Sequence, residues 1–171
     1  MILISLFIFS SMLWQETFTD TTLTMSQLYD YSIDISQKEG KVFLKANPES
    51  EGFAAVWFYV DEDIAFSSDD ILKLVIKVNT NKVRFRYLYR REGRKVYFRG
   101  EEVISPDEQW QKVKIPLGEA KPIYSSNYPY ALTPDKNPCL FIFIDNELPG
   151  YFDVEIDSIY VFRTESQGEE K

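Results

Sequence analysis

The sequence contains no histidine and a single cysteine, Cys139. The absence of histidine excludes Ser-His-Asp and Cys-His catalytic arrangements, histidine metal ligands and the usual proton carrier near neutral pH. One cysteine permits no intrachain disulfide and no zinc site built from cysteine and histidine. We expect Cys139 to be a buried small hydrophobe, because it begins the apolar run 139–144. Glycine-rich phosphate loops, G-x-S-x-G and C-x-x-C are also missing, so any chemistry would rest on carboxylates, arginine, lysine or tyrosine.

Positive charge is scarce in the chain as a whole. There are 19 Lys and Arg against 27 Asp and Glu, which gives a formal net charge of −8. Such a balance argues against nucleic acid as a partner, since phosphate binding needs a basic surface. The 171 residues suit one domain, and the hydrophobic share of 44% supplies a core and excludes disorder throughout.

The N-terminal stretch Ile2–Trp14 has thirteen residues and no charge. It fits the apolar region of a secretory signal and is short for a bilayer span, although no basic residue precedes it and no A-x-A-like site follows. We predict a signal segment over 1–15, a linker over 16–27, and an exported protein (periplasmic, cell-surface or extracellular) with no stable membrane span after processing. A buried N-terminal strand is the alternative, because Phe7, Ile8 and Phe9 favour β structure.

Short β-type runs separated by turn signals fill the rest of the chain. They cover 41–45, 53–60, 71–78, 83–90, 95–99, 110–115, 140–144 and 152–162. Several alternate apolar and polar residues, which is typical of antiparallel strands, and no helical period is sustained beyond one turn at 107–111. The pattern predicts an all-β, antiparallel two-sheet β-sandwich over 28–163, followed by a disordered tail over 164–171.

Basic residues gather in one segment of this acidic chain. Lys82–Arg99 holds eight basic residues and one acid. Strand alternation places Arg84, Arg86 and Arg90 on the face away from the core, and Tyr97 shares that face on the paired strand. Two interpretations stay open: the arginines pair with carboxylates of a neighbouring strand, or they form a face that binds an oxygen-rich ligand.

Three motifs together resemble a known superfamily. Residues 110–117 are similar to its W-x-x-V-x-I-P-L strand, residues 66–77 to its D-x-S-x-Y-x-x-L-x-F-x-V-K segment, and residues 152–161 to its Y-x-I-D-x-I-x-V ending. This is the pattern of galactose-binding-like jelly rolls, which include carbohydrate-binding modules and the complex I intermediate-associated protein family. The resemblance covers roughly Leu28 to Arg163 and implies a jelly-roll fold, but it does not specify a ligand.

The resemblance also suggests roles for individual residues. Trp110 is expected to supply apolar area to one edge of the core, and Pro116 to end its strand because proline has no N–H for the ladder. In the superfamily an acid near the last strand often helps to hold a structural calcium together with an acid near the first. Asp30 and Asp157 are the matching positions here, so a structural calcium is predicted as an option and no other cofactor is required. A turn-capping or lysine-paired Asp157 is the alternative.

Aromatic residues supply the candidate ligand contacts. If Val56, Phe58 and Val60 face the core, Trp57 and Tyr59 face out, and the reverse assignment stays open. The long loop Pro122–Pro138 carries Tyr124 and Tyr128, which either meet a ligand or pack inward. Arg84, Arg86 and Tyr97 form the third group, and a basic face would suit a uronic-acid or sulfated glycan.

The sequence therefore favours a non-catalytic carbohydrate-binding domain of an exported protein, with an acidic glycan as one ligand class and a polysaccharide or oligosaccharide as partner. The alternative is a protein-interaction or assembly domain without a sugar ligand, whose partner is another protein. Enzyme activity is not expected, because 27 acids permit a hydrolytic pair but no spacing singles one out.

Overall fold

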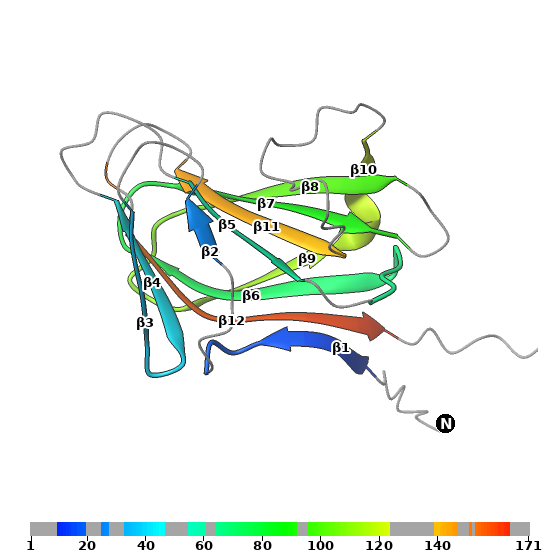
Figure 1. Cartoon of the computed structure of the whole chain (residues 1–171), viewed down its shortest axis with the longest axis horizontal. Coiled ribbons are helices and arrows are strands. Elements are labelled where there is room, and N and C mark those ends of the chain that lie inside the picture. Colours follow the sequence, from blue (N-terminus) through cyan, green and yellow to red (C-terminus); the bar gives the residue numbers. More distant parts are fainter. Residues whose placement is uncertain are drawn as a thin grey trace, which may run out of the picture.

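Two antiparallel β-sheets lie face to face in the computed structural model (Figure 1). The structure describes residues 10–19, 25–27, 33–46, 55–60, 64–91, 96–123, 139–146, 151 and 153–164. For 10, 25–27, 33, 46, 55–60, 146 and 164 it describes the backbone alone. We call the two layers sheet A and sheet B. The all-β sandwich predicted from the sequence is confirmed.

Sheet A has the strand order β3-β4-β12-β6-β9, with β1 also paired to β12. Strand β12 is long enough to pair with β4 through its first residues and with β1 through its last. The bounds are β1 Ser10–Glu16, β3 Ile33–Lys38, β4 Lys41–Ala46, β6 Asp70–Val78, β9 Gln111–Pro116 and β12 Asp153–Thr164.

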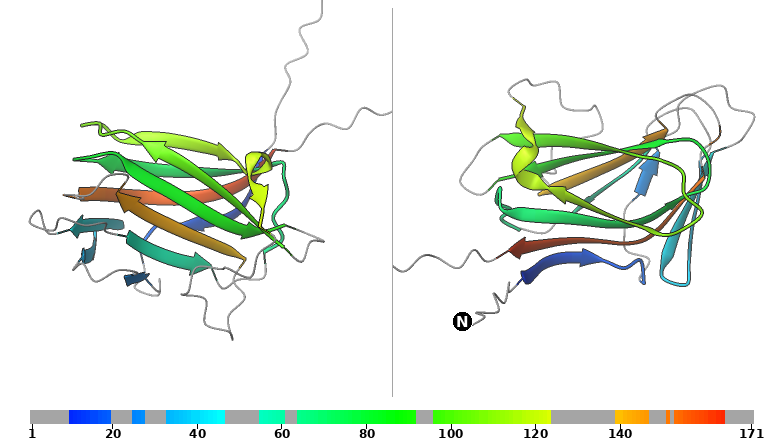
Figure 2. Two further views of the ribbon diagram at one scale, coloured as in Figure 1. Left: turned by 90° about the horizontal axis from the view of Figure 1, so that it is seen from above. Right: turned by 180° about the vertical axis from the view of Figure 1, so that it is seen from behind.

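Sheet B has the order β10-β8-β7-β11-β5-β2. Its strands are β2 Met25–Gln27, β5 Ala55–Val60, β7 Val83–Arg90, β8 Tyr97–Ile104, β10 Lys121–Pro122 and β11 Leu140–Asn146. A short 3-10 helix, η1 Leu117–Glu119, joins β9 to β10 and so crosses from one sheet to the other (Figure 2).

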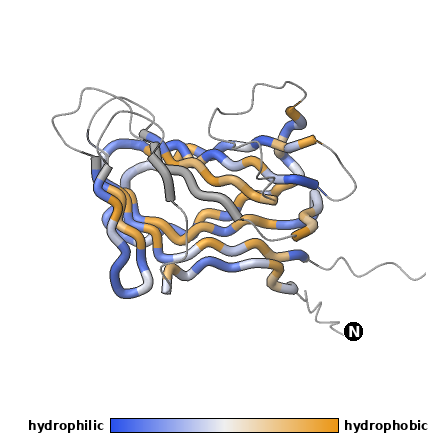
Figure 3. The backbone as a smooth tube through the Cα atoms, in the orientation of Figure 1, coloured by the Kyte–Doolittle hydropathy of each residue, from blue (hydrophilic) through white to orange (hydrophobic). Residues whose placement is uncertain are grey.

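The core lies between the sheets and follows the two-residue period of the strands. Every second residue of β6 is buried, as are Val83, Phe85, Tyr87 and Tyr89 of β7. Figure 3 shows hydrophobic and hydrophilic residues alternating along strands of the sandwich. The Tyr89 hydroxyl donates a hydrogen bond to the Leu117 carbonyl at 2.8 Å, which ties sheet B to η1. In β6 the alternation of the pleat places the buried apolar residues on the core side and both lysines, Lys73 and Lys77, on the outer side.

Gly100 of β8 lies opposite Tyr87 in this core. A Cβ atom at position 100 would come within 2.1 Å of the Tyr87 hydroxyl and 2.2 Å of the ring. Glycine is therefore required here by the close approach of a buried ring, not by its backbone angles.

Residues of the predicted signal segment and linker take part in the sheets. Ser10–Glu16 pairs with β12, and Trp14 and Phe18 belong to the buried core. A strand was the alternative that the sequence left open for this stretch. Residues 1–9 and 165–171 lie outside the described residues. Removal of a leader therefore stays a prediction. Within the described residues, no helix has the length and apolar character to cross a bilayer.

All eight β-type runs predicted from the sequence overlap strands of the structure. Strands β2, β3 and β10 and the helix η1 were not predicted, and β1 corresponds to the N-terminal strand that was left open as an alternative. The sequence before β4 lacks the usual Asn-Gly signal of a two-residue hairpin turn, so β3 was not predicted. The β3–β4 hairpin instead turns at Glu39 and Gly40, whose φ angles are 55° and 69°. The buried thiol predicted for Cys139 is confirmed.

Trp110 was expected to fill one edge of the core, and that expectation is wrong. Its side chain is 38% exposed, and the Lys41 ammonium lies 5.7 Å from its ring centroid. The residue precedes β9, whose inward positions are taken by Val113 and Ile115 instead. Pro116 ends β9 as predicted.

Candidate functional site

The outer face of sheet B carries Arg84, Arg86 and Tyr97 of the predicted ligand residues, and the left view of Figure 2 looks down on this sheet. Strand β11 lies between β5 and β7, so the pairing register aligns residues from strands far apart in sequence. Residues directly opposite in an antiparallel pair belong to the same face. The first cross-strand row runs Trp57, Phe143, Arg86, Glu101 and the second runs Tyr59, Phe141, Leu88, Arg99.

Aromatic and aliphatic side chains form the floor of this face. Phe141 and Phe143 stack with centroids 6.3 Å apart, and Tyr97 meets Phe141 edge-on at 6.2 Å. With Leu88 they are all buried, although they do not belong to the core between the sheets. Sheet B therefore carries a second apolar layer on its outer side.

An ion pair crosses this layer. The guanidinium of Arg86 on β7 contacts the carboxylate of Asp145 on β11. The central carbon of the same guanidinium lies 5.9 Å from the Phe143 ring centroid. Burial raises the pKa of Asp145, and the nearby Arg86 and Arg84 only partly oppose that rise. Within the described part of the chain, Arg86 Nε and Asp145 Oδ1 are buried and have no hydrogen-bond partner.

The two interpretations of the arginines thus apply to different residues. Arg86 pairs with a carboxylate of a neighbouring strand, as the first interpretation held. Arg84 is half-buried, and among the described residues no carboxylate lies within ion-pair distance of it. Arg99 forms a surface pair with Glu101 at 3.3 Å. Arg84 lies directly opposite Asp145 in the pairing of β7 with β11, and its charge helps to oppose the rise in the pKa of that carboxyl.

The predicted ligand residues are brought together in part. Arg84, Arg86 and Tyr97 share the face, and the backbone register adds positions 57 and 59 to it. Tyr97 is only 6% exposed, so it belongs to the floor rather than the rim. Tyr124 and Tyr128 lie outside the described residues.

Phe141, Phe143 and Asp145 were not predicted as site residues. The run 139–144 reads as a continuously apolar strand, which gives no sign that alternate residues face away from the core. Only the insertion of β11 between β5 and β7 places them beneath the arginines.

The predicted calcium position is only partly within the described residues. Asp157 lies in a β-bulge between Ile156 and Ser158 of β12, and its carboxylate accepts a hydrogen bond from the Ser158 hydroxyl at 2.9 Å. Asp30 lies outside the described residues. In the part of the chain that the structure describes, no three acidic or cysteine residues cluster as metal ligands would, so calcium stays a prediction.

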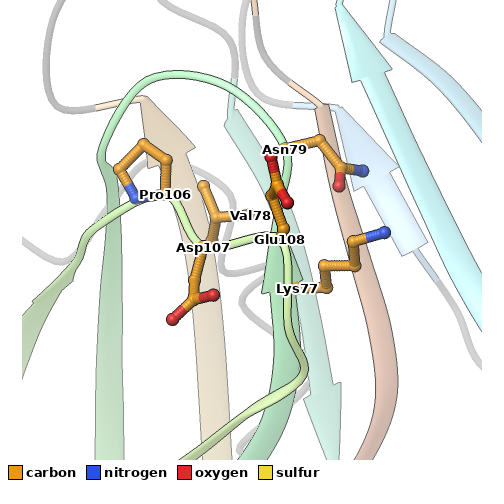
Figure 4. A pocket seen from close by; sticks show the side chains of 6 residues that line it. All are labelled: Lys77, Val78, Asn79, Pro106, Asp107 and Glu108. Carbon is orange, nitrogen blue, oxygen red and sulfur yellow. The ribbon is translucent and has the colours of Figure 1, made fainter.

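A separate hollow of about 450 Å³ lies at the end of β6, beside the β8–β9 connection (Figure 4). Asp107 and Glu108 contribute carboxylates to it, but Asp107 accepts a hydrogen bond from the Gln109 backbone at 2.8 Å. The Asp107 backbone in turn donates to the Val78 carbonyl at 3.1 Å. These contacts hold the loop against β6, and of the predicted site residues that the structure describes, none lines this hollow.

The fold is that of β-sandwich carbohydrate-binding modules, so the fold implied by the jelly-roll resemblance is confirmed. A family 11 carbohydrate-binding module of the cellulosomal cellulase Lic26A-Cel5E from Clostridium thermocellum aligns with a TM-score of 0.61, 14% identity and coverage of 95% of this chain and 99% of that one. A family 11 module from the same organism, in complex with a β-1,3-1,4-mixed-linked tetrasaccharide, aligns with a TM-score of 0.59, 14% identity and coverage of 91% and 95%.

The CBM22-1 xylan-binding domain of Paenibacillus barcinonensis Xyn10C aligns with a TM-score of 0.50, 12% identity and coverage of 92% and 97%. At such identities the similarity concerns the fold alone. No family model and no curated protein matches the chain.

Proposed function

We propose that this chain is a non-catalytic carbohydrate-binding domain and that the outer face of sheet B holds its polysaccharide or oligosaccharide ligand. The observation that carries the proposal is the row in which the register aligns Trp57, Phe143 and Arg86. Flat aromatic surfaces suit the C–H side of a pyranose ring, and fixed polar groups suit its hydroxyls. The shared fold with carbohydrate-binding modules supports the same reading.

An acidic sugar is the finer part of the proposal. Arg86 is committed to Asp145, whereas Arg84 lies in the adjacent row without an ion pair among the described residues. A guanidinium can bind a carboxylate through two parallel hydrogen bonds. Arg84 would then contact the carboxylate of a uronic acid while Trp57 packs against the sugar ring.

Export is also proposed, on the strength of the uncharged segment Ile2–Trp14, although its residues from Ser10 onward form β1 and would have to stay in the folded protein. Catalysis forms no part of the proposal, and the buried carboxylate of Asp145 on this face is engaged in an ion pair with Arg86.

Glycan-array binding, followed by titration of the best neutral and uronic-acid oligosaccharides, tests this function. Trp57→Ala should weaken binding at least tenfold, the loss expected when a central aromatic contact is removed. Trp110→Ala is the matched control, since Trp110 lies outside sheet B and is already exposed.

Arg84→Gln should weaken only the acidic ligands, and Lys38→Gln, an exposed lysine of β3, should weaken none. Absence of binding to every glycan, together with a protein that co-purifies stoichiometrically, would instead favour the interaction-domain alternative.

A further inference from the structure

A second hollow of about 660 Å³ lies on the outer face of sheet A, on the opposite side of the sandwich from the proposed ligand face. Lys73, Lys112 and Lys114 line it together with Tyr160. Strand register explains the grouping: Lys73 of β6 lies directly opposite Lys114 of β9 on one side and Tyr160 of β12 on the other. The Lys73 ammonium is 5.7 Å from the Tyr160 ring centroid.

Positive charge exceeds negative charge in this hollow, although the net charge of the chain is −8. Among the described residues none of the three is within ion-pair distance of a carboxylate, whereas Lys77 on the same face of β6 lies 3.8 Å from Glu155. Like charges directly opposite on neighbouring strands destabilise a sheet. Asp157 also lines the hollow, and its carboxylate accepts a hydrogen bond from the Ser158 hydroxyl, so three ammonium groups share the hollow with one carboxylate.

Protection of a sheet edge explains only part of this arrangement. Strand β9 is an edge strand of sheet A, and edge lysines commonly prevent pairing with another chain. That role accounts for Lys112 and Lys114. It does not account for Lys73, because β6 is paired on both sides.

We propose that the Lys73–Lys112–Lys114 hollow is a second binding site that takes an anionic polysaccharide, carboxylated or sulfated. The amines start from backbone positions about 5 Å apart across the strands and about 7 Å apart along β9, a spacing that suits repeated charges on one chain. Tyr160, Phe162 and the 56% exposed Met12 supply an apolar surface beside them for the sugar rings. This combination of ammonium groups with flat apolar area favours a glycan over an acidic polypeptide, which needs no such surface.

Affinity electrophoresis through gels containing polygalacturonate, with a neutral β-glucan gel for comparison, tests the proposal. The experiment uses the full chain carrying Trp57→Ala and Arg84→Gln, so that loss of the sheet B face cannot be confused with loss of this site. Polygalacturonate should still retard this protein, and added salt should reduce the effect because it screens the ammonium charges.

Adding Lys73→Gln, Lys112→Gln and Lys114→Gln should weaken the retardation at least tenfold. The matched control changes three exposed lysines elsewhere, Lys38, Lys82 and Lys121, to Gln and reaches the same net charge; it should keep the retardation. Equal loss in both triple variants, no retardation by polygalacturonate at the start, or tighter binding to poly-glutamate would each overturn the proposal. Equal urea midpoints for the two triple variants exclude misfolding as the cause.

Discussion

Replacing Arg86 by Met tests the ion pair at the centre of the sheet B face. The change keeps the aliphatic length and leaves the carboxylate of Asp145 buried without its guanidinium partner. Breaking a fully buried pair costs about 3–5 kcal/mol, and the Arg86 side chain is 26% exposed, so some of the charge is screened by water. We expect Arg86→Met to lower the free energy of unfolding by about 2–3 kcal/mol at pH 7.

The loss of unfolding free energy caused by Arg86→Met should increase as the pH rises. Burial already raises the pKa of Asp145 above its ordinary value of 3.8, and loss of Arg86, the foremost group opposing that rise, should raise the pKa further. A carboxyl with a raised folded-state pKa contributes stability below its unfolded pKa and loses it as pH rises through the folded value. The cost of Arg86→Met should therefore be small at pH 3.5, where the carboxyl is protonated, and reach its full size by pH 7.

Urea unfolding followed by tryptophan fluorescence at the two pH values measures this. In an Asp145→Asn background, Arg86→Met should cost less and lose its pH dependence, because no buried carboxylate remains. Arg99→Met is the control, since Arg99 forms an exposed pair on the same face and such pairs contribute about 0–1 kcal/mol. An equal cost at both pH values, or strict additivity with Asp145→Asn, would refute the reasoning.

Two further predictions concern the packing of Tyr87. Gly100→Ala should lower the free energy of unfolding by about 1–3 kcal/mol, because the added methyl overlaps the Tyr87 ring; a change below 0.5 kcal/mol in urea unfolding would contradict the packing. Burial raises the pKa of Tyr87 to about 12 from an ordinary 10, so the stability that its neutral form contributes is present below pH 10 and is lost as pH rises toward 12. Between pH 10 and pH 12 the free energy of unfolding of Tyr87→Phe should therefore rise by about 2–3 kcal/mol relative to that of the native chain. If the two proteins instead change in stability in parallel over that range, the Tyr87 hydroxyl titrates normally and the prediction is wrong.

The strands themselves were predictable from local pattern. The alternation in Ile71–Val78 and Val83–Arg90 identified both the strands and their buried faces, and the arginines do share one face. Strand β3 was not recognised, because it pairs with β4 across an unusual turn, and β1 was predicted only as an alternative, because its partner β12 lies far along the chain. Trp110 was misassigned because a motif position was read as a core position.

What the sequence determined by itself was which residues alternate and therefore which side chains share a face of each strand. Which strands become neighbours was decided by the tertiary structure. The placement of β11 beside β7 gives Arg86 its carboxylate partner, and the placement of β6 between β9 and β12 groups Lys73 with Lys114 and Tyr160. The physical reason is that alternation is a local property of the pleated backbone, whereas strand order depends on contacts between segments separated by tens of residues.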